Sequence, residues 1–427
     1  MIFIQEKLLK APKKVNIKSL VISSIIPFLI LGPFIPDLIV SLSSLIFIIY
    51  VVKHKEYRFF NNKYLIFFFI FSLYFIICSL FSDNIFLSFE SSLFYFRVGI
   101  FSCVIWYLIE KEKKILNYFY FILILSFLAL VIDGYIQFFV GKNILGLPRH
   151  EHRISSFFGN EYIMGSYLSR LFPLLFAFFL IKKKEKFEKY LIAITFVLVE
   201  ILIYLSGERA AFAFLNISTF FIIVLIKEYK KLRILSLLSS MILIFLLTMS
   251  SQTLKERMII NPIKSMNLDS EKGFQIFSVF HDSSIKTAYK MFLDKPISGH
   301  GPKMFRVKCK NTAYQIGIAP CTTHPHNFYV QLLAETGVIG VCFLFGIFIL
   351  VIFVAFKQIR SIINNDKKRF ISDYQVCLLA AVLITVWPIA PNGNFFNNWL
   401  MIVYSLPVGF LLHSIYGKNK RIVSIVK

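Results

Sequence analysis

The sequence predicts an all-α integral membrane protein with about twelve transmembrane helices, and three observations support this fold class. Of the 427 residues, 57% are hydrophobic and only 16% are charged. The mean hydropathy is +0.71. A span needs roughly 20 apolar residues, so the apolar content is enough for about twelve spans. A soluble multidomain enzyme is excluded.

Twelve apolar runs give the predicted order of the spans. Nine lie within residues 1–251, and a long polar stretch, residues 252–326, follows them. The last three lie within residues 327–427, which end in a polar tail. We therefore expect three regions: spans one to nine, one large loop, and spans ten to twelve with the C-terminal tail. The runs lie near residues 19–35, 38–52, 64–82, 86–109, 116–140, 162–181, 190–206, 210–226, 234–251, 327–356, 372–391 and 399–416.

The basic residues predict the orientation of these spans. When the linkers are assigned alternately to two sides, 30 of the 47 Lys and Arg residues fall on the side that holds both termini. Positive residues near span ends resist translocation, so this side is predicted to be cytoplasmic. The 252–326 loop then faces outward, because long loops escape this rule. Topology thus explains the net charge of +24, and no nucleic-acid partner is expected.

Histidines gather on the predicted outer side, where nucleotides are not expected. A transfer reaction there would draw its driving force from a donor carried on a lipid. His326 is the candidate general base, because an imidazole titrates near neutral pH. At 100° per residue, Gly337 and Gly340 return to the face of His326, which predicts the close approach of another helix. The alternative is an interfacial histidine beside a glycine packing seam. The surrounding segment is Thr323-His324-Pro325-His326-Asn327.

Arg97 and Arg170 lie inside the predicted spans four and six. An unpaired charge there costs roughly 2.5–3.5 kcal/mol or more, so both are candidate substrate-binding residues. The alternative is a structural ion pair with Glu90, Asp133 or Glu200.

Arg209 and Arg153 lie on predicted outer turns. Arg209 follows span seven, and Arg153 precedes Asn160 near the start of span six. The planar fork of guanidinium donors suits phosphate oxygens. Anchoring to the phosphates of membrane lipids is the alternative.

Two of the six cysteines, Cys309 and Cys321, lie in the predicted outer loop. An oxidising space lets a disulfide persist there, which would fix the segment just ahead of His324. Two free thiols are the alternative.

These residues resemble the O-antigen ligase family and its polymerase relatives. His326-Asn327, nine residues, Gly337, two residues and Gly340 fit the family pattern His-[Asn/Ser/Gln]-x9-Gly-x-x-[Gly/Thr/Tyr]. The resemblance covers the whole chain and includes the layout of twelve spans with one large outer loop. Further matching elements are Arg153 to Asn160 as the Arg-plus-Phe-Gly-Asn element, Arg209 as the arginine after span seven, and Pro296 to Gly301, with His300, as the Pro-x-x-Gly-x-Gly element.

The resemblance implies a glycan transfer on the periplasmic side of the bacterial inner membrane. The donor would be a glycan on undecaprenyl pyrophosphate, and the transfer would be inverting, with neither metal nor cofactor. By this likeness His326 is the base, and Arg209 and Arg153 stabilise the departing pyrophosphate. Asn160, His300, His324 and Asn327 are the further candidates for substrate binding.

One position departs from the family pattern. Members often carry an arginine early in the large loop, and here His281 takes that place. His281 is therefore a candidate substrate-binding residue or else part of a helix cap. Lys286, Lys290 and Arg257 are alternative sources of the positive charge.

Three activities are compatible with the sequence, and the acceptor distinguishes the first two. Lipid A-core as the acceptor would make the protein a ligase, which the Gly-x-x-Gly ending favours. A second lipid-linked glycan would make it a polymerase. A twelve-span secondary transporter is a remoter alternative, because such transporters usually have a long cytoplasmic connection after span six. Here that connection is only residues 182–189.

Overall fold

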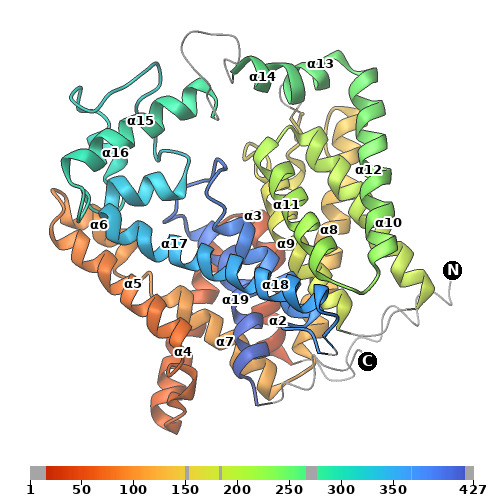
Figure 1. The fold of residues 1–427 in the computed structure, drawn as a ribbon, viewed down its shortest axis with the longest axis horizontal. Helices are drawn as coiled ribbons and strands as arrows, with labels where there is room; N and C mark the ends of the chain where they lie inside the picture. The colour runs from red at the N-terminus through yellow and green to blue at the C-terminus, as the bar shows by residue number, and fades with distance from the viewer. Residues whose placement is uncertain (1–15, 150–152, 182–184, 266–276, 367, 419–427) are drawn as a thin grey trace.

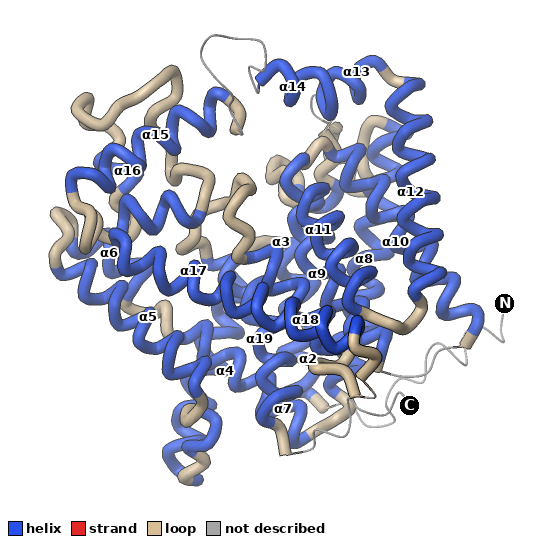
Figure 2. The backbone as a smooth tube through the Cα atoms, viewed as in Figure 1, coloured by secondary structure: helices blue, strands red, loops and turns tan. Residues whose placement is uncertain are grey.

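The computed structural model describes residues 16–149, 153–181, 185–265, 277–366 and 368–418. Helix is the regular structure throughout these ranges, and the described chain has only one isolated β-bridge, between Lys142 and Pro148 (Figure 2). The all-α prediction is confirmed for the described residues. The basic residues before Asn16 and after Lys418, which entered the orientation prediction, lie outside them.

The helices follow the apolar runs of the sequence along the whole chain (Figure 1). They are α2 (Ile17–Ser23), α3 (Ile25–Leu31), α4 (Phe34–His54), α5 (Lys63–Leu80), α6 (Ile85–Ser92), α7 (Arg97–Lys111), α8 (Ile115–Val140), α9 (Met164–Leu180), α10 (Lys186–Ser206), α11 (Arg209–Leu225), α12 (Lys230–Ser250), α13 (Gln252–Lys255), α14 (Asn261–Ser265), α15 (Val279–Asp294), α16 (Phe305–Lys308), α17 (Phe328–Ile363), α18 (Asp373–Thr385) and α19 (Asn398–Tyr416).

Eight helical stretches are long and apolar enough to cross a membrane, which supports a polytopic membrane protein. Four shorter apolar stretches lie at the positions of the other predicted spans: α2–α3, α9, α11 and α18. The number twelve and the orientation stay predictions, because helix length alone does not fix them.

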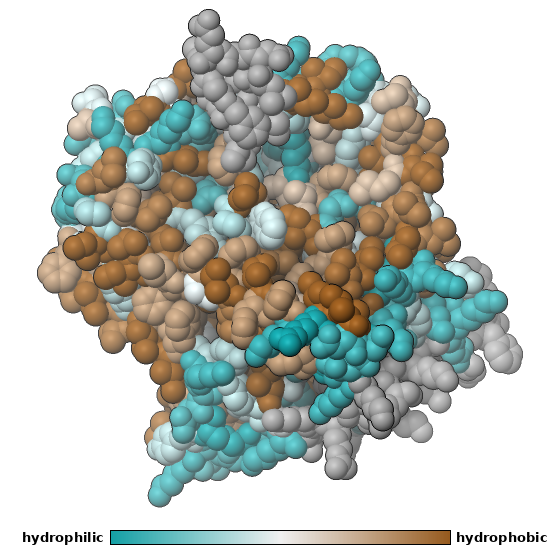
Figure 3. All heavy atoms as spheres, in the orientation of Figure 1, coloured by the Kyte–Doolittle hydropathy of each residue, from teal (hydrophilic) through white to brown (hydrophobic). Residues whose placement is uncertain are grey.

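The surface is apolar around the middle of the molecule. Large apolar side chains are exposed on peripheral helices, for example Ile46 on α4 and Phe353 on α17. Figure 3 shows a brown hydrophobic band, with hydrophilic residues at the lower edge and on α15–α16 above. Helices α7, α9, α18 and α19 form the interior, and on α9 every residue except Ser166 is buried. This distribution suits a bundle surrounded by lipid.

Residues 251–265 and 277–327, here called the outer segment, connect α12 to α17. They carry α13–α16, which Figure 1 shows in the upper part of the view. Within the segment, the sulfurs of Cys309 and Cys321 form a disulfide. Helix α15 packs against α17, so the segment rests on the first turns of that helix.

The prediction that Gly337 lets another helix approach was wrong, because α17 breaks at this residue. Gly337 has φ 66° and ψ −170°, and the amide of Val338 donates to the oxygen of Pro296 at 2.9 Å. A Cβ at Gly337 would lie 2.1 Å from the carbonyl oxygen of Ile297. The glycine therefore admits the backbone of the outer segment, and not another helix.

Candidate functional site

A cavity of about 1150 Å³ opens where five parts of the chain meet. Its wall comes from α3, the turns before α9 and α11, the outer segment and the loop between α18 and α19. Among the predicted site residues that line it are Arg153, Arg170, Arg209, His281 and His324.

His326 is fixed by its neighbours on both sides. Asn327 caps α17, and its Oδ1 accepts from the amides of Tyr329 (3.0 Å) and Val330 (3.1 Å). Asn327 Nδ2 donates to the oxygen of Pro388 at 2.8 Å. His326 itself has φ 57°, in the left-handed region, so its backbone is held away from helical geometry.

Three imidazole rings form a cluster at the cavity wall. The ring of His326 lies 4.6 Å from that of His281 and 4.3 Å from that of His324, measured between centroids. His281 and His324 line the cavity, and His326, which is half-buried and contacts both rings, is not itself a lining residue. The candidate base is thus in contact with two residues that line the cavity.

Burial makes all three histidines weaker bases than usual. It lowers the pKa of His326 to about 4, with a smaller effect from His281. It lowers the pKa of His324 to about 3, with further lowering by His326. The pKa of His281 is also lowered, first by burial and then by the charge of Arg209. Near neutral pH each ring is uncharged and able to accept a proton.

Arg209 and Arg153 both line this cavity. Arg209 is exposed at the start of α11. The guanidinium carbon of Arg153 lies 4.5 Å from the centre of the Tyr162 ring, and its buried Nε has no hydrogen-bond partner among the described residues. Two cations side by side with a free donor form a site for an anion.

Glu208 stabilises the backbone between these arginines. Its carboxylate accepts from the amides of Gly165 (2.6 Å) and Ser166 (3.0 Å), at the start of α9. Burial raises the pKa of Glu208 to about 7, and the two amides and Arg153 oppose this shift.

Arg170 lies inside the bundle on α9 and also lines the cavity. Its Nη2 donates to Asn392 Oδ1 at 2.6 Å, and its Nε donates to Ser166 Oγ at 3.2 Å. The ion pairs expected with Asp133 or Glu200 do not form. Asp133 accepts from Ser156 Oγ (2.5 Å), and Glu200 accepts from Ser240 Oγ (2.5 Å).

Arg97 takes the structural alternative, with a partner that sequence reasoning missed. Its Nη2 contacts Asp37 Oδ1 at 2.7 Å, and it is not a cavity residue. The predicted partner, Glu90, instead pairs with Lys303 at 2.9 Å. The sequence offered no signal for a contact across 60 positions.

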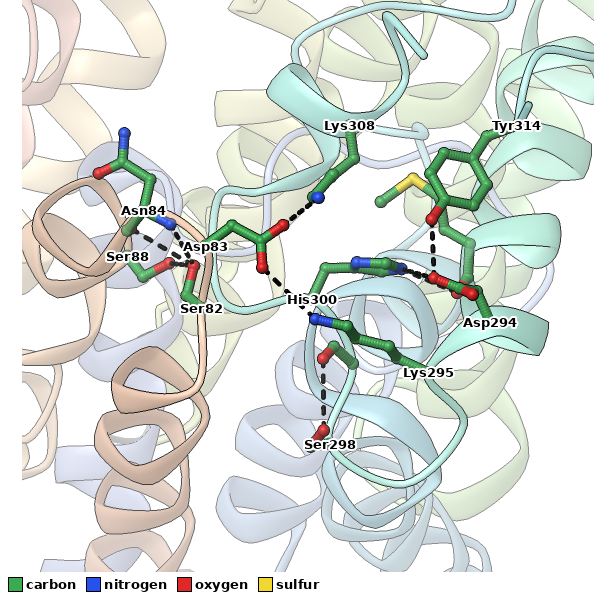
Figure 4. A network of polar contacts seen from close by, with 12 residues as sticks. Ser82, Asp83, Asn84, Ser88, Asp294, Lys295, Ser298, His300, Lys308 and Tyr314 are labelled. Atoms are coloured by element: carbon green, nitrogen blue, oxygen red, sulfur yellow. Dashed lines mark hydrogen bonds and ion pairs between the residues drawn. The ribbon is translucent and has the colours of Figure 1, made fainter. Parts of the chain in front are cut away.

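His300 and Asn160 do not line the cavity. Asn160 is exposed, and His300 is 1% exposed with its Nε2 lying 3.0 Å from the oxygen of Met291. Figure 4 shows His300 beside Asp294. In the same view, Asp83 forms ion pairs with Lys295 (3.5 Å) and with Lys308. These pairs attach the outer segment to the turn between α5 and α6, and His300 is buried within that segment.

Three cavity residues were missed or undervalued. Asn392 and Arg306 drew no prediction, and Arg257 entered only as a substitute for the family's loop arginine. Lys286, another suggested substitute, pairs with Asp282 at 2.7 Å. The polar run from Pro391 to Asn394 between two apolar spans was the available signal for Asn392.

The described residues contain no group of three His, Cys, Asp or Glu side chains placed to hold a metal ion.

Residues 192–345 match the family model described as O-antigen ligase. The match covers just over a third of the chain, so the likeness is shown for this segment. The family resemblance is confirmed, and the match supports a membrane enzyme of the O-antigen ligase or polymerase type. The O-antigen ligase segment contains Arg209 and the histidine cluster, whereas Arg153, Arg170 and Asn392 lie outside it. A search of curated proteins found no match to the chain.

Proposed function

We propose that the protein transfers a glycan from a polyprenyl diphosphate carrier to an acceptor hydroxyl at the periplasmic face of the inner membrane. One observation carries the proposal: the cluster of three histidines adjoins a cavity lined by Arg153, Arg209, Arg257 and Arg306. A neutral base beside several guanidiniums suits a reaction that deprotonates one partner and expels an anion from the other.

The bond changes follow from this placement. The acceptor oxygen attacks the anomeric carbon, while its proton passes to an imidazole nitrogen of His326. The bond from that carbon to the diphosphate oxygen breaks, and its electron pair stays on the diphosphate. Attack from the side opposite to the leaving group inverts the anomeric configuration.

His326 is the preferred base within the cluster. It is the histidine of the family motif, and its ring contacts those of both His281 and His324. A bound diphosphate raises the pKa of a nearby imidazole, because negative charge favours the imidazolium. Binding of the donor therefore strengthens the base.

The arginines stabilise the leaving group. Arg209 lies close enough to His281 for its charge to lower the pKa of that ring. Arg153 and Arg306 each carry a buried Nε without a partner in the described part of the chain. Such donors are ready for phosphate oxygens before the transition state forms, which is the basis of electrostatic catalysis.

The acceptor in this proposal is lipid A-core, and the alternative is a second lipid-linked glycan. A strain that lacks the gene separates the two. A ligase defect leaves long glycan chains unattached to lipid A-core, whereas a polymerase defect leaves single-unit or short chains.

The test of the chemistry is His326→Ala in proteoliposomes supplied with lipid-linked glycan and acceptor. We expect transfer to fall by at least about a hundredfold, the usual effect of losing a general base. His324→Ala is the matched variant and should cost less. Near-normal transfer by His326→Ala would remove the general-base assignment.

A further inference from the structure

Arg170 and Asn392 form a polar pair in the wall of the cavity. Both line the cavity, and each is 5% exposed. Arg170 Nη2 donates to Asn392 Oδ1 at 2.6 Å. The guanidinium carbon lies 4.5 Å from the ring centre of Phe214 and 5.4 Å from that of Tyr404. Aromatic rings and one amide thus hold the guanidinium in a fixed orientation.

Two hydrogen-bond donors of this pair have no acceptor among the described residues. Arg170 Nη1 and Asn392 Nδ2 are buried and have no hydrogen-bond partner within the described ranges. Arg170 also forms no ion pair there, since its polar partners are Ser166 and Asn392. A buried cation without a counter-ion is costly unless a ligand supplies the negative charge. Two unused donors on one cavity wall are therefore a site for an oxyanion.

The pair lies deeper than the arginines at the mouth. Glu208, directly before Arg209, contacts the amide of Gly165 on α9. Arg170 is five residues further along α9, and Phe214, which it contacts, is five residues beyond Arg209 on α11. At the rise of an α-helix this offset is about 7–8 Å toward the predicted cytoplasmic end.

We infer that Arg170 and Asn392 bind the phosphate attached to the lipid of the carrier, while Arg209 and Arg153 contact the phosphate that bears the sugar. The inference deepens the proposed function and rests on it. The lipid of such a donor lies in the bilayer and its glycan lies outside. Of the two phosphates, the lipid-attached one is therefore the deeper, and it meets the deeper cation.

The apolar side chains of the cavity agree with this assignment. Leu29, Leu31, Phe214 and Trp399 line the same cavity. These side chains suit an isoprenoid chain, and they offer few partners for the hydroxyl groups of a glycan.

The test uses a ligand that has only one of the two phosphates. Undecaprenyl monophosphate binding is measured on the full chain in nanodiscs, for the natural sequence, Arg170→Gln and Arg209→Gln. We expect Arg170→Gln to weaken binding about tenfold or more, as for a lost charge-assisted contact, and Arg209→Gln to weaken it less than about threefold. Equal losses in the two variants, or none in Arg170→Gln, would overturn the inference.

Two further variants control for folding. Asn392→Asp places a carboxylate beside Arg170 as an ion-pair partner, so the protein should stay folded. The same carboxylate should repel the phosphate, so binding should be lost. Arg97→Gln removes a membrane arginine that pairs with Asp37 outside the cavity, and it should bind like the natural sequence. Unchanged binding by Asn392→Asp would contradict the inference.

Competition identifies the source of the phosphate. Inorganic phosphate and the lipid A-core acceptor should not displace the monophosphate at equal concentration. Displacement by either would assign the site to free phosphate or to the acceptor, and would reject the carrier.

His326→Ala separates this inference from the proposed function. That variant should bind the monophosphate normally even though it transfers no glycan. If the natural chain transfers no glycan but its binding depends on Arg170, the proposed reaction fails and the lipid-phosphate site stands. If transfer occurs without dependence of binding on Arg170, the site fails and the reaction stands.

Discussion

The backbone amide of Asn392 donates a hydrogen bond of 2.8 Å to the carbonyl oxygen of His326. The side chain of the same asparagine accepts from Arg170 at 2.6 Å. One residue of the α18–α19 loop therefore contacts both the candidate base and the buried Arg170. The loop fixes the distance between the two, although it lies 66 positions beyond the histidine in sequence.

Asn327→Ala tests whether anchoring His326 to this loop matters for catalysis. The change removes a helix cap worth about 1 kcal/mol and the contact with the oxygen of Pro388. We expect lower thermal stability and a fall in kcat with little change in KM, measured by unfolding in detergent and by the transfer assay. Asn62→Ala is the control, because Asn62 also caps a helix, α5, and donates to a backbone oxygen, that of Phe59. It should lose similar stability but keep kcat, and equal kcat losses would contradict the anchoring role.

Gly337→Ala tests the break in α17. A Cβ there would meet the oxygen of Ile297 at 2.1 Å, and the residue would keep a positive φ. We expect a loss of stability of about 1–3 kcal/mol, seen as a lower melting temperature, together with loss of transfer. Gly346→Ala lies on the same helix with open space, its nearest neighbour being Phe67 at 3.9 Å, and it should be neutral or slightly stabilising. Similar melting temperatures for the two variants would refute the proposed constraint.

The pH profile tests the neutral state of His326. Burial lowers its pKa, so the neutral form persists as the pH falls from 7 and is lost only near about 4. The acid limb of kcat/KM, which reports the free enzyme, should thus lie well below the ordinary histidine value of about 6.5. The acid limb of kcat should lie higher, since the bound diphosphate raises the pKa. A kcat/KM limb at about 6.5 would show that the ring is not desolvated before the donor binds.

The disulfide offers a fourth test. Cys309→Ser with Cys321→Ser opens a link across 12 positions, for which chain entropy gives about 3 kcal/mol. We expect a lower melting temperature and slower transfer, because the loop that the disulfide holds leads directly into His324. Cys342→Ser changes an exposed free cysteine and should alter neither. Unchanged transfer by the double variant would mean that the histidine cluster is positioned without the disulfide.

Arg209→Lys asks whether two donors or a charge alone is required. Lysine keeps the charge but loses the planar fork, so we expect transfer to fall at least about tenfold if Arg209 contacts the diphosphate. Arg97→Lys, at a position that pairs with Asp37 away from the cavity, should retain transfer. Equal activity of Arg209→Lys and the natural sequence would reduce Arg209 to a general electrostatic role.

Much of the fold and part of the site follow from sequence because they depend on local properties. Apolar runs gave the positions of the helices, and the motif around His326 located the cluster. The partner of Arg97 and the role of Asn392 depend on packing between distant helices, which periodicity does not encode. The break at Gly337 was missed for a related reason. Counting residues around a helix assumes that its own carbonyls are the best partners, whereas here the oxygen of Pro296 takes the amide of Val338.

The break in α17 also determines which crossover points suit a chimaeric protein. The amides of His300 and Gly301 donate to the oxygens of Ala334 and Glu335, and the amide of Phe305 donates to the Glu335 side chain at 3.0 Å. The first turns of α17 are thus joined to the loop ahead of them. A chimaera with a relative that exchanges residues 252–326 would divide this unit between two parents, whereas an exchange through residue 337 would graft it whole.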